Sequence, residues 1–185
     1  MQFNTYTAAA AQIACWLANH LEPDAAEFAL LLASYDVHEP APTEAQARQL
    51  QSWARRLRAV FEADALADKA AQTDALLIAA DCTPRLVRHA AGLPFHLHYA
   101  PVRTSLTARV KALTAAGLAH MIDDGSGDRL RSCRRANCAT TFIDASRNGR
   151  RKFCSVRCAN QVNVARHRAR QRNPCAVPEK LGGRR

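Results

Sequence analysis

The chain has 185 residues, of which 48% are hydrophobic, and a formal net charge of +10 at pH 7. It contains no apolar run near the roughly 18 residues that a membrane-spanning helix needs, which excludes an integral membrane helix and predicts one sizeable core with a small appendage. The charge is uneven: residues 1–128 hold 10 basic and 14 acidic residues, whereas residues 129–173 hold 13 basic residues and one acidic residue. The sequence therefore predicts a mildly acidic body that carries a strongly basic end.

Apolar residues recur at helical spacing along most of residues 1–122, which predicts a mainly α-helical N-terminal domain. The predicted helices cover residues 7–21, about 24–39, 43–67, 69–80 and 104–121. The third has the clearest start, because Thr43 and Gln46 fit a capping box. Its stripe includes Trp53 and Phe61, and core packing explains such a stripe better than a small-molecule pocket. The pattern leaves open whether this helical domain senses a small-molecule ligand or mediates homodimer formation.

Three arginines of the body and three further cysteines have no functional role in the predicted organisation. A solvated helix face is the simplest explanation for the three arginines Arg55, Arg56 and Arg58, which lie off the apolar stripe. Three further cysteines have no metal-ligand spacing and are interpreted as incidental: Cys15, Cys82 and Cys175.

A small β-hairpin is predicted before the last helix of this domain, because residues 85–89 and 95–99 alternate in period two around a turn. His96 and His98 would share one face of the second strand, with His89 as a neighbour. A His-x-His pair can bind metal, but no third ligand has diagnostic spacing. An ordinary hairpin face is therefore the preferred interpretation.

The domain boundary is predicted at Asp123-Asp124-Gly125-Ser126-Gly127-Asp128, whose composition is typical of a short polar flexible linker. The charge reverses sign immediately after it. The predicted organisation is a helical domain over residues 1–122, a linker over 123–128, a zinc finger over 129–173 and a basic flexible tail over 174–185.

The C-terminal end is organised by four cysteines, Cys133, Cys138, Cys154 and Cys158, which form two close pairs separated by fifteen residues. Two such pairs suit one tetrahedral zinc ion. Disulfides need an oxidising compartment, and residues 1–14 lack the basic segment of an export signal. Uncommitted reduced thiols are the other alternative. The preferred prediction is one structural zinc ion in a cytoplasmic protein.

The spacing also predicts the shape of the finger. A helix capped near Ser155 would hold the last two cysteines one turn apart, and residues 156–171 contain neither Pro nor Gly. Short strands are expected at residues 131–132 and 140–143, with Gly149 in a turn that needs positive φ. The finger is thus predicted to be treble-clef-like and to end in a basic helix. Its small predicted core consists of Leu130, Phe142, Ile143, Phe153 and Val156.

The charge of residues 129–173 points to an anionic partner. A zinc ion with four thiolates carries about −2, far too little to neutralise the 13 basic residues of this segment. Nucleic-acid phosphates are the favoured counter-surface, with an anionic membrane surface and a disordered basic tail as alternatives. The predicted phosphate contacts are Arg147, Arg150, Arg151, Lys152, Arg166, Arg168 and Arg170. Predicted contacts to base edges are Asn160, Gln161 and Asn163, and Arg157 is a further predicted nucleic-acid contact.

Duplex DNA is favoured over RNA, because the finger has few aromatic side chains on which single-stranded bases stack. An RNA-binding protein and a protein-interaction adaptor are the alternatives. Catalysis is not expected, since treble-clef nucleases need a base and a metal-binding histidine near the helix, and residues 139–153 contain no histidine.

The ordered motifs of this end resemble the CGNR zinc finger. They are Leu130-Arg131-Ser132-Cys133, Cys138, Phe142-Ile143-Asp144-Ala145-Ser146-Arg147-Asn148, Arg150-Arg151-Lys152-Phe153-Cys154-Ser155 and Cys158-Ala159-Asn160. The resemblance implies a bacterial DNA-binding transcription regulator with an N-terminal ABATE-like helical domain. The chain departs from the family name, because Cys158-Ala159-Asn160-Gln161 replaces Cys-Gly-Asn-Arg. Alanine is more favourable than glycine inside a helix by about 1 kcal/mol. The missing arginine, in contrast, removes one guanidinium group that could bind a phosphate.

Overall fold

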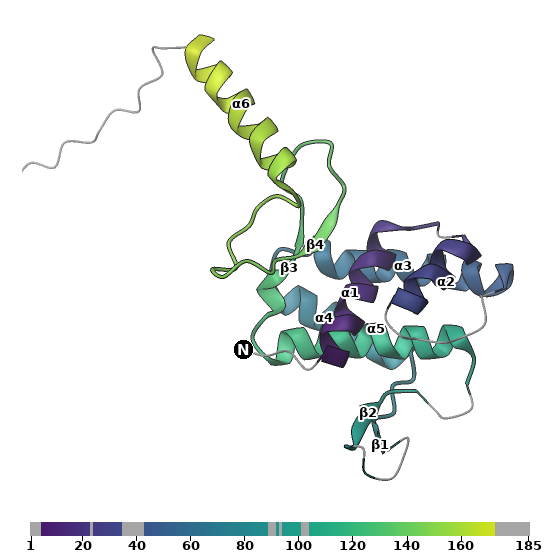
Figure 1. Ribbon diagram of the computed structural model, residues 1–185. Coiled ribbons are helices and arrows are strands. Elements are labelled where there is room, and N and C mark those ends of the chain that lie inside the picture. Colours follow the sequence, from purple (N-terminus) through teal and green to yellow (C-terminus); the bar gives the residue numbers. More distant parts are fainter. Residues whose placement is uncertain are drawn as a thin grey trace, which may run out of the picture.

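Figure 1 shows the computed structural model, which describes residues 5–22, 24–34, 43–88, 92, 94–100 and 104–172, apart from the side chains of residues 5–8, 32 and 34. The elements are α1 (Thr5–Asn19), α2 (Ala25–Ser34), α3 (Glu44–Glu62), α4 (Leu66–Ala79), β1 (Arg85–Val87), β2 (His96–His98), α5 (Leu106–Asp123), the 3-10 turn η1 (Gly127–Arg129), β3 (Leu130–Ser132), β4 (Thr141–Ile143) and α6 (Val156–Arg172). The predicted tail of residues 174–185, Cys175 and His89 lie outside the described residues. Within these described residues the fold is mainly α-helical with two small hairpins, as predicted.

The core of the body forms where α1 packs against α3 and α5. Leu17, Phe61 and Leu118 are among its fully buried side chains. α1 and α5 approach closely at Gly117, where an added Cβ would lie 2.7 Å from backbone and side-chain atoms of Ala10. A larger residue at this position would separate the two helices.

The start of α3 confirms the predicted capping box. The side-chain hydroxyl of Thr43 accepts from the backbone N–H of Gln46 at 3.3 Å, and the Gln46 side chain accepts from the Thr43 N–H at 2.8 Å. Trp53 is buried, and its indole N–H donates to the hydroxyl of Thr114 at 2.9 Å. Phe61 is 1% exposed, so the apolar stripe of this helix serves the core, as expected.

The junction between α3 and α4 differs from the prediction. The third helix ends at Glu62 instead of about residue 67, and the fourth begins at Leu66 instead of residue 69. Ala63 and Ala65 take extended backbone conformations between them, although no Gly or Pro marks a break. The turn lets α4 pack back on α3, and the Lys69 ammonium then donates to the Val60 carbonyl at 3.2 Å. Tertiary packing has therefore overridden local helix propensity here.

The predicted hairpin is present and forms a two-stranded sheet at the end of the body away from α6 (Figure 1). Its antiparallel register pairs Arg85 with His98 and Val87 with His96. The Nε2 atoms of His96 and His98 lie 3.0 Å apart, so the two rings do share a face. Among the described residues no Cys, His, Asp or Glu completes a three-ligand group with them.

The segment 123–128, predicted as a flexible linker, is partly buried, because Ser126 and Gly127 are buried whereas Asp123, Asp124, Gly125 and Asp128 are exposed. Asp123 is the last residue of α5, and Ser126 is only 5% exposed. The Ser126 N–H donates to the Met121 carbonyl at 2.8 Å and to the Asp124 side chain at 3.0 Å. Leu130, which follows η1, is fully buried in the core of the helical body. The chain therefore enters β3 from a fixed direction.

Candidate metal centre and its basic helix

The first half of the site is the β3–β4 hairpin, in which Leu130 pairs with Ile143 and Ser132 with Thr141. Between the strands the chain makes a knuckle. The Cys133 N–H donates to the Thr140 carbonyl at 2.9 Å, and Asn137 has a φ of +62°, a left-handed conformation that Asn tolerates. This turn brings Cys133 and Cys138 to the same end of the hairpin.

The second half of the site is the start of α6, which begins at Val156 as predicted. The hydroxyl of Ser155 accepts from the N–H of Cys158 at 3.2 Å and so caps the helix. This cap places Cys158 one turn after Cys154, with the two sulfur atoms 3.6 Å apart.

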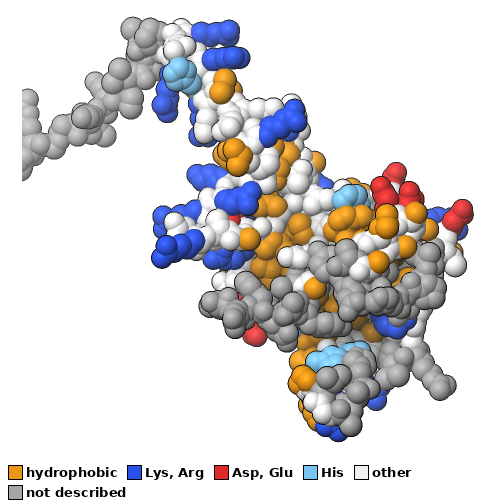
Figure 2. All heavy atoms as spheres, viewed as in Figure 1, with side chains coloured by type: hydrophobic (Ala, Val, Ile, Leu, Met, Phe, Trp, Pro, Cys, Tyr) orange, Lys and Arg blue, Asp and Glu red, His pale blue; other side chains and the backbone are white. Residues whose placement is uncertain are grey.

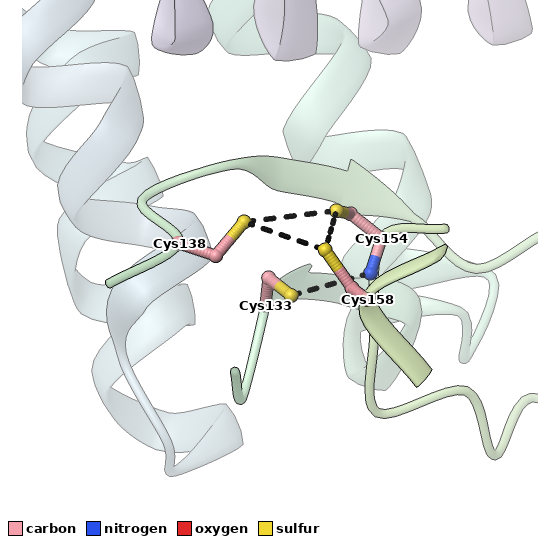
Figure 3. A group of neighbouring side chains, drawn as sticks. All are labelled: Cys133, Cys138, Cys154 and Cys158. Atoms are coloured by element: carbon pink, nitrogen blue, oxygen red, sulfur yellow. Dashed lines mark hydrogen bonds between the residues drawn. The ribbon is translucent and has the colours of Figure 1, made fainter. Parts of the chain in front are cut away.

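The four cysteine side chains converge on one point, as Figure 3 shows. Their sulfur atoms all lie within 4.8 Å of one another. The Cys138 sulfur is 3.8 Å from that of Cys154 and 3.9 Å from that of Cys158. Cys133 and Cys158 are buried, and the other two are half-buried. Two ligands thus come from the hairpin and two from the segment that starts α6.

This sulfur arrangement fits one zinc ion. A zinc–sulfur bond of about 2.3 Å in a tetrahedron implies sulfur pairs about 3.8 Å apart. The three separations among Cys138, Cys154 and Cys158 are close to this value. Disulfide sulfurs lie about 2.05 Å apart, and all four of these cysteines are free. The donor set is entirely soft sulfur, which favours zinc over calcium or magnesium. The four cysteines therefore form a structural zinc site with no ligand position left for water.

The surroundings of the four cysteines shift the pKa values of their thiols in different directions. The Arg135 guanidinium donates to the Cys158 sulfur at 3.2 Å, and the Cys154 N–H donates to the Cys133 sulfur at 3.5 Å. Hydrogen bonding with Thr140 lowers the pKa of Cys138 to about 6, whereas burial raises the pKa of Cys154 to about 12. Zinc must displace the protons that such thiols retain at neutral pH, so its affinity is expected to fall in acid.

Comparison with protein families also identifies a zinc finger in the segment that holds the four cysteines. Residues 129–171 match the family model of the CGNR zinc finger. These residues are a CGNR zinc finger. A search of curated proteins gave no match for the chain. The ABATE-like character of the helical body stays a prediction.

The CGNR finger accommodates both departures from its name. Ala159 lies in the first turn of α6, where a helical backbone suits alanine, and its N–H donates to the Ser155 carbonyl at 3.1 Å. Gln161, at the place of the family arginine, is exposed on α6. Neither residue supplies a metal ligand, so the zinc site is unaffected by the two replacements.

A single buried carboxylate shapes the basic loop of the CGNR finger. Asp144 is fully buried, and one of its oxygens accepts from the N–H and the hydroxyl of Ser146 at 2.9 and 2.6 Å. The other oxygen accepts from the N–H of Arg151 at 2.7 Å. Burial alone would raise the Asp144 pKa, but the hydrogen bonds from Ser146 and Arg151 outweigh it and lower the pKa. Gly149, with φ +59°, makes the predicted turn in this loop.

Replacing Asp144 by asparagine is expected to lower the free energy of unfolding by about 1–3 kcal/mol, because an amide nitrogen cannot accept the hydrogen bonds of a carboxylate oxygen. The effect is measured by urea unfolding of the zinc-loaded chain at pH 7. The pKa of Asp144 is lowered in the folded state, so its contribution is present above the unfolded pKa of about 3.9 and is lost as pH falls through the lower folded value. Asp74→Asn, at an exposed position on α4, is the control. Equal stability of the two variants at pH 7 would contradict the role of Asp144.

The CGNR finger is docked on the helical body by hydrogen bonds that the sequence did not reveal. The Asn19 side chain donates to the Thr141 carbonyl at 2.9 Å and accepts from the Thr141 N–H at 2.8 Å, as a neighbouring strand would. Arg58 donates to the carbonyls of Ala18 and Ala139 and pairs with Glu62. The prediction of a solvated face is therefore wrong for Arg58, whose side chain is 16% exposed.

Three further residues lie in surroundings that the sequence did not predict. Cys15, interpreted as incidental, lies against the finger with its sulfur 3.6 Å from the Thr141 carbonyl. Val156, placed in the predicted finger core, is 75% exposed. Leu130 is buried as predicted, but it packs in the core of the body.

The predicted nucleic-acid contacts form an exposed basic surface over the finger loop and α6 (Figure 2). The exposed residues are Arg147, Arg150, Arg151, Lys152, Arg157, Asn160, Gln161, Asn163, Arg166, Arg168 and Arg170. Arg151 also has a structural role, because its guanidinium donates to the Cys154 carbonyl at 2.8 Å and lies over the Phe142 ring. The members of this set are thus not equivalent.

Proposed function

We propose that this protein is a zinc-dependent DNA-binding transcription regulator whose CGNR finger and α6 contact duplex DNA. In this proposal the protein acts in the cytoplasm, catalyses no reaction, and has a helical body that senses a ligand or mediates association. The zinc ion has a structural role, since four cysteines occupy its coordination positions. The observation that carries the proposal is the exposure and charge of α6.

Beyond its first turn, α6 has no buried residue within the part of the chain that the structure describes. Of its 17 described residues only Cys158 is buried, and the helix contains no acidic residue. Figure 1 shows it projecting away from the body. A basic helix without a buried face gains stability from an anionic partner, and the major groove of DNA, about 12 Å wide, admits an α-helix.

The chemistry of one α6 face suits base contacts between two phosphate contacts. Arg157, Asn160, Gln161, Val164 and Arg168 recur at three- and four-residue spacing and line one open surface. The central amides can hydrogen-bond base edges, Val164 can contact a thymine methyl group, and the flanking arginines can reach phosphates. By helical spacing Asn163 lies with Arg166 and Arg170 away from this face, so Asn160 and Gln161 are the better candidates for sequence readout.

The test is fluorescence anisotropy of the zinc-loaded full chain with labelled duplex DNA and single-stranded RNA over a range of salt concentrations. The variant is Arg166→Gln/Arg168→Gln/Arg170→Gln, at three exposed positions where glutamine preserves helix propensity. We expect weaker binding to all duplex sequences and a log-salt slope that is smaller by about 0.9 for each lost phosphate contact.

The matched control is Arg48→Gln/Arg55→Gln/Arg85→Gln, which removes the same charge from exposed positions of the body. Its salt slope should equal that of the wild type. The proposal fails if both triple variants change the slope equally. Tighter binding of single-stranded RNA would favour the RNA-binding alternative, and binding of neither nucleic acid would favour a protein-interaction adaptor.

A further inference from the structure

A cavity of about 470 Å³ lies between the helical body and the CGNR finger. Its wall on the body side comes from the end of α3 and the start of α4, and the finger contributes β3 and the segment before Cys154. A volume in this range is typical of small-molecule sites. The two parts of the protein therefore share one cavity large enough for a ligand.

The lining of this junction cavity is strongly cationic. Five basic side chains reach it: Lys69, Arg131, Arg134, Arg151 and Lys152. Only two carboxylates, Asp64 and Asp128, line it as well. Asp64 is already paired with Arg134 at 2.6 Å. Small-molecule pockets are usually mostly apolar, so this composition favours an anionic ligand.

Lys69 is the least expected residue in the cavity wall, because it is only 3% exposed. Its ammonium donates to the carbonyls of Leu130 at 2.7 Å and Val60 at 3.2 Å. An ammonium has three N–H donors. Within the part of the chain that the structure describes, the third donor has no acceptor and no carboxylate lies within ion-pair distance of Lys69.

A buried cation whose direct contacts are neutral carbonyls is costly, because burial removes its hydration and no carboxylate within ion-pair distance compensates. Burial accordingly lowers the pKa of Lys69, while the more distant Asp128 and Asp64 oppose this shift. An anion in the cavity would supply both the missing charge and the missing acceptor. The Lys69 ammonium is therefore suited to bind an anion in the cavity directly.

The finger side of the cavity holds its guanidinium groups in fixed positions. Arg131 donates to the carbonyls of Asp128, Gly149 and Arg151 at 2.7, 3.0 and 3.3 Å. These bonds use three of its five N–H donors and leave two for a ligand. Because the groups are already ordered, little conformational entropy is lost when an anion binds.

We propose that the junction cavity binds the phosphate group of a small molecule between Lys69 of the body and Arg131 and Arg134 of the finger. A ligand held from both sides ties the finger to the body. It would thereby stabilise the orientation of α6, so binding at the cavity is a means of regulating the finger. The site itself does not depend on the proposed DNA binding.

The experiment measures binding of inorganic phosphate to the zinc-loaded full chain by calorimetry, with thermal unfolding in sodium phosphate and in sodium chloride of equal ionic strength. We expect saturable binding and a higher Tm in phosphate than in chloride. Lys69→Met, which keeps the apolar stem, and Arg134→Gln, at an exposed position, should each weaken phosphate binding at least about tenfold. Since Lys69→Met alters a buried residue, Arg134→Gln keeps the test decisive if the first variant is unstable.

The α6 variant Arg166→Gln/Arg168→Gln/Arg170→Gln serves as the control, because these side chains lie outside the cavity. It should bind phosphate like the wild type even if its binding to DNA is weakened. This outcome separates the cavity proposal from the DNA-binding proposal. A second titration with saturating duplex DNA identifies the source of the phosphate: unchanged binding indicates a free small molecule, and exclusion indicates the DNA backbone. The proposal is overturned if phosphate acts no differently from chloride, or if Arg134→Gln and Lys69→Met bind it like the wild type.

Discussion

Replacing Cys158 by serine is expected to remove zinc from the protein and to unfold the finger around it. The site draws two sulfur ligands from the hairpin and two from the start of α6, so losing Cys158 leaves three ligands for zinc, of which only Cys154 comes from the α6 side. Structural zinc sites contribute on the order of 10 kcal/mol to folding. Zinc stoichiometry should fall from one per chain to near zero, and far-UV circular dichroism should show the loss of α6.

The body should keep its helices in the Cys158→Ser variant but melt at a lower temperature than in the wild type. This expectation follows from the docked finger, because Thr141 and Ala139 supply partners to Asn19 and Arg58 of the body. Fluorescence of Trp16 and Trp53, which both lie in the body, would report this shift during thermal unfolding.

Cys82→Ser is the matched control, because Cys82 lies outside the zinc cluster and is half-buried. Burial raises the pKa of this thiol to about 11, so it stays protonated and is a poor zinc ligand at neutral pH. The control should bind one zinc ion and melt like the wild type. Full zinc occupancy in Cys158→Ser would contradict the assignment of the cluster as the metal site.

Features set by local rules were predictable from the sequence. The cysteine spacing located the zinc site, Ser155 marked the start of α6, and Thr43 with Gln46 marked the start of α3. Each depends on residues a few positions apart in the chain, or on the fixed geometry of a metal. The histidine-bearing hairpin was found in the same way, from its period-two pattern.

The placement of the finger on the body was not predictable, because it depends on residues far apart in the sequence. Asn19 is 122 residues from Thr141, and neither residue belongs to a motif. Residues 123–128 have the composition of a flexible segment, but such rules describe an isolated chain and ignore the contacts that bury Ser126. The burial of Lys69 does have a signal in the sequence, because Lys69 recurs with Thr73 and Leu76 at helical spacing on the buried face of α4.

The docked arrangement changes what the boundary residue Leu130 is expected to do. Leu130 is the first residue of β3, yet it is fully buried in the core of the helical body, and its carbonyl accepts from the Lys69 ammonium. Leu130→Ala would leave a cavity at the point where the finger joins the body. We expect it to lower the free energy of unfolding by about 2–5 kcal/mol.

Two probes in one urea titration test whether finger and body unfold together. Tryptophan fluorescence follows the body, and release of zinc to a chromogenic chelator follows the finger. If Leu130 couples them, Leu130→Ala shifts both transitions to lower urea by the same amount. Leu86→Ala, at a position 68% exposed on the β1–β2 hairpin, is the control and should stay within about 0.5 kcal/mol of the wild type. A Leu130→Ala variant whose body unfolds as in the wild type would mean that the finger is tethered to the body without sharing its core.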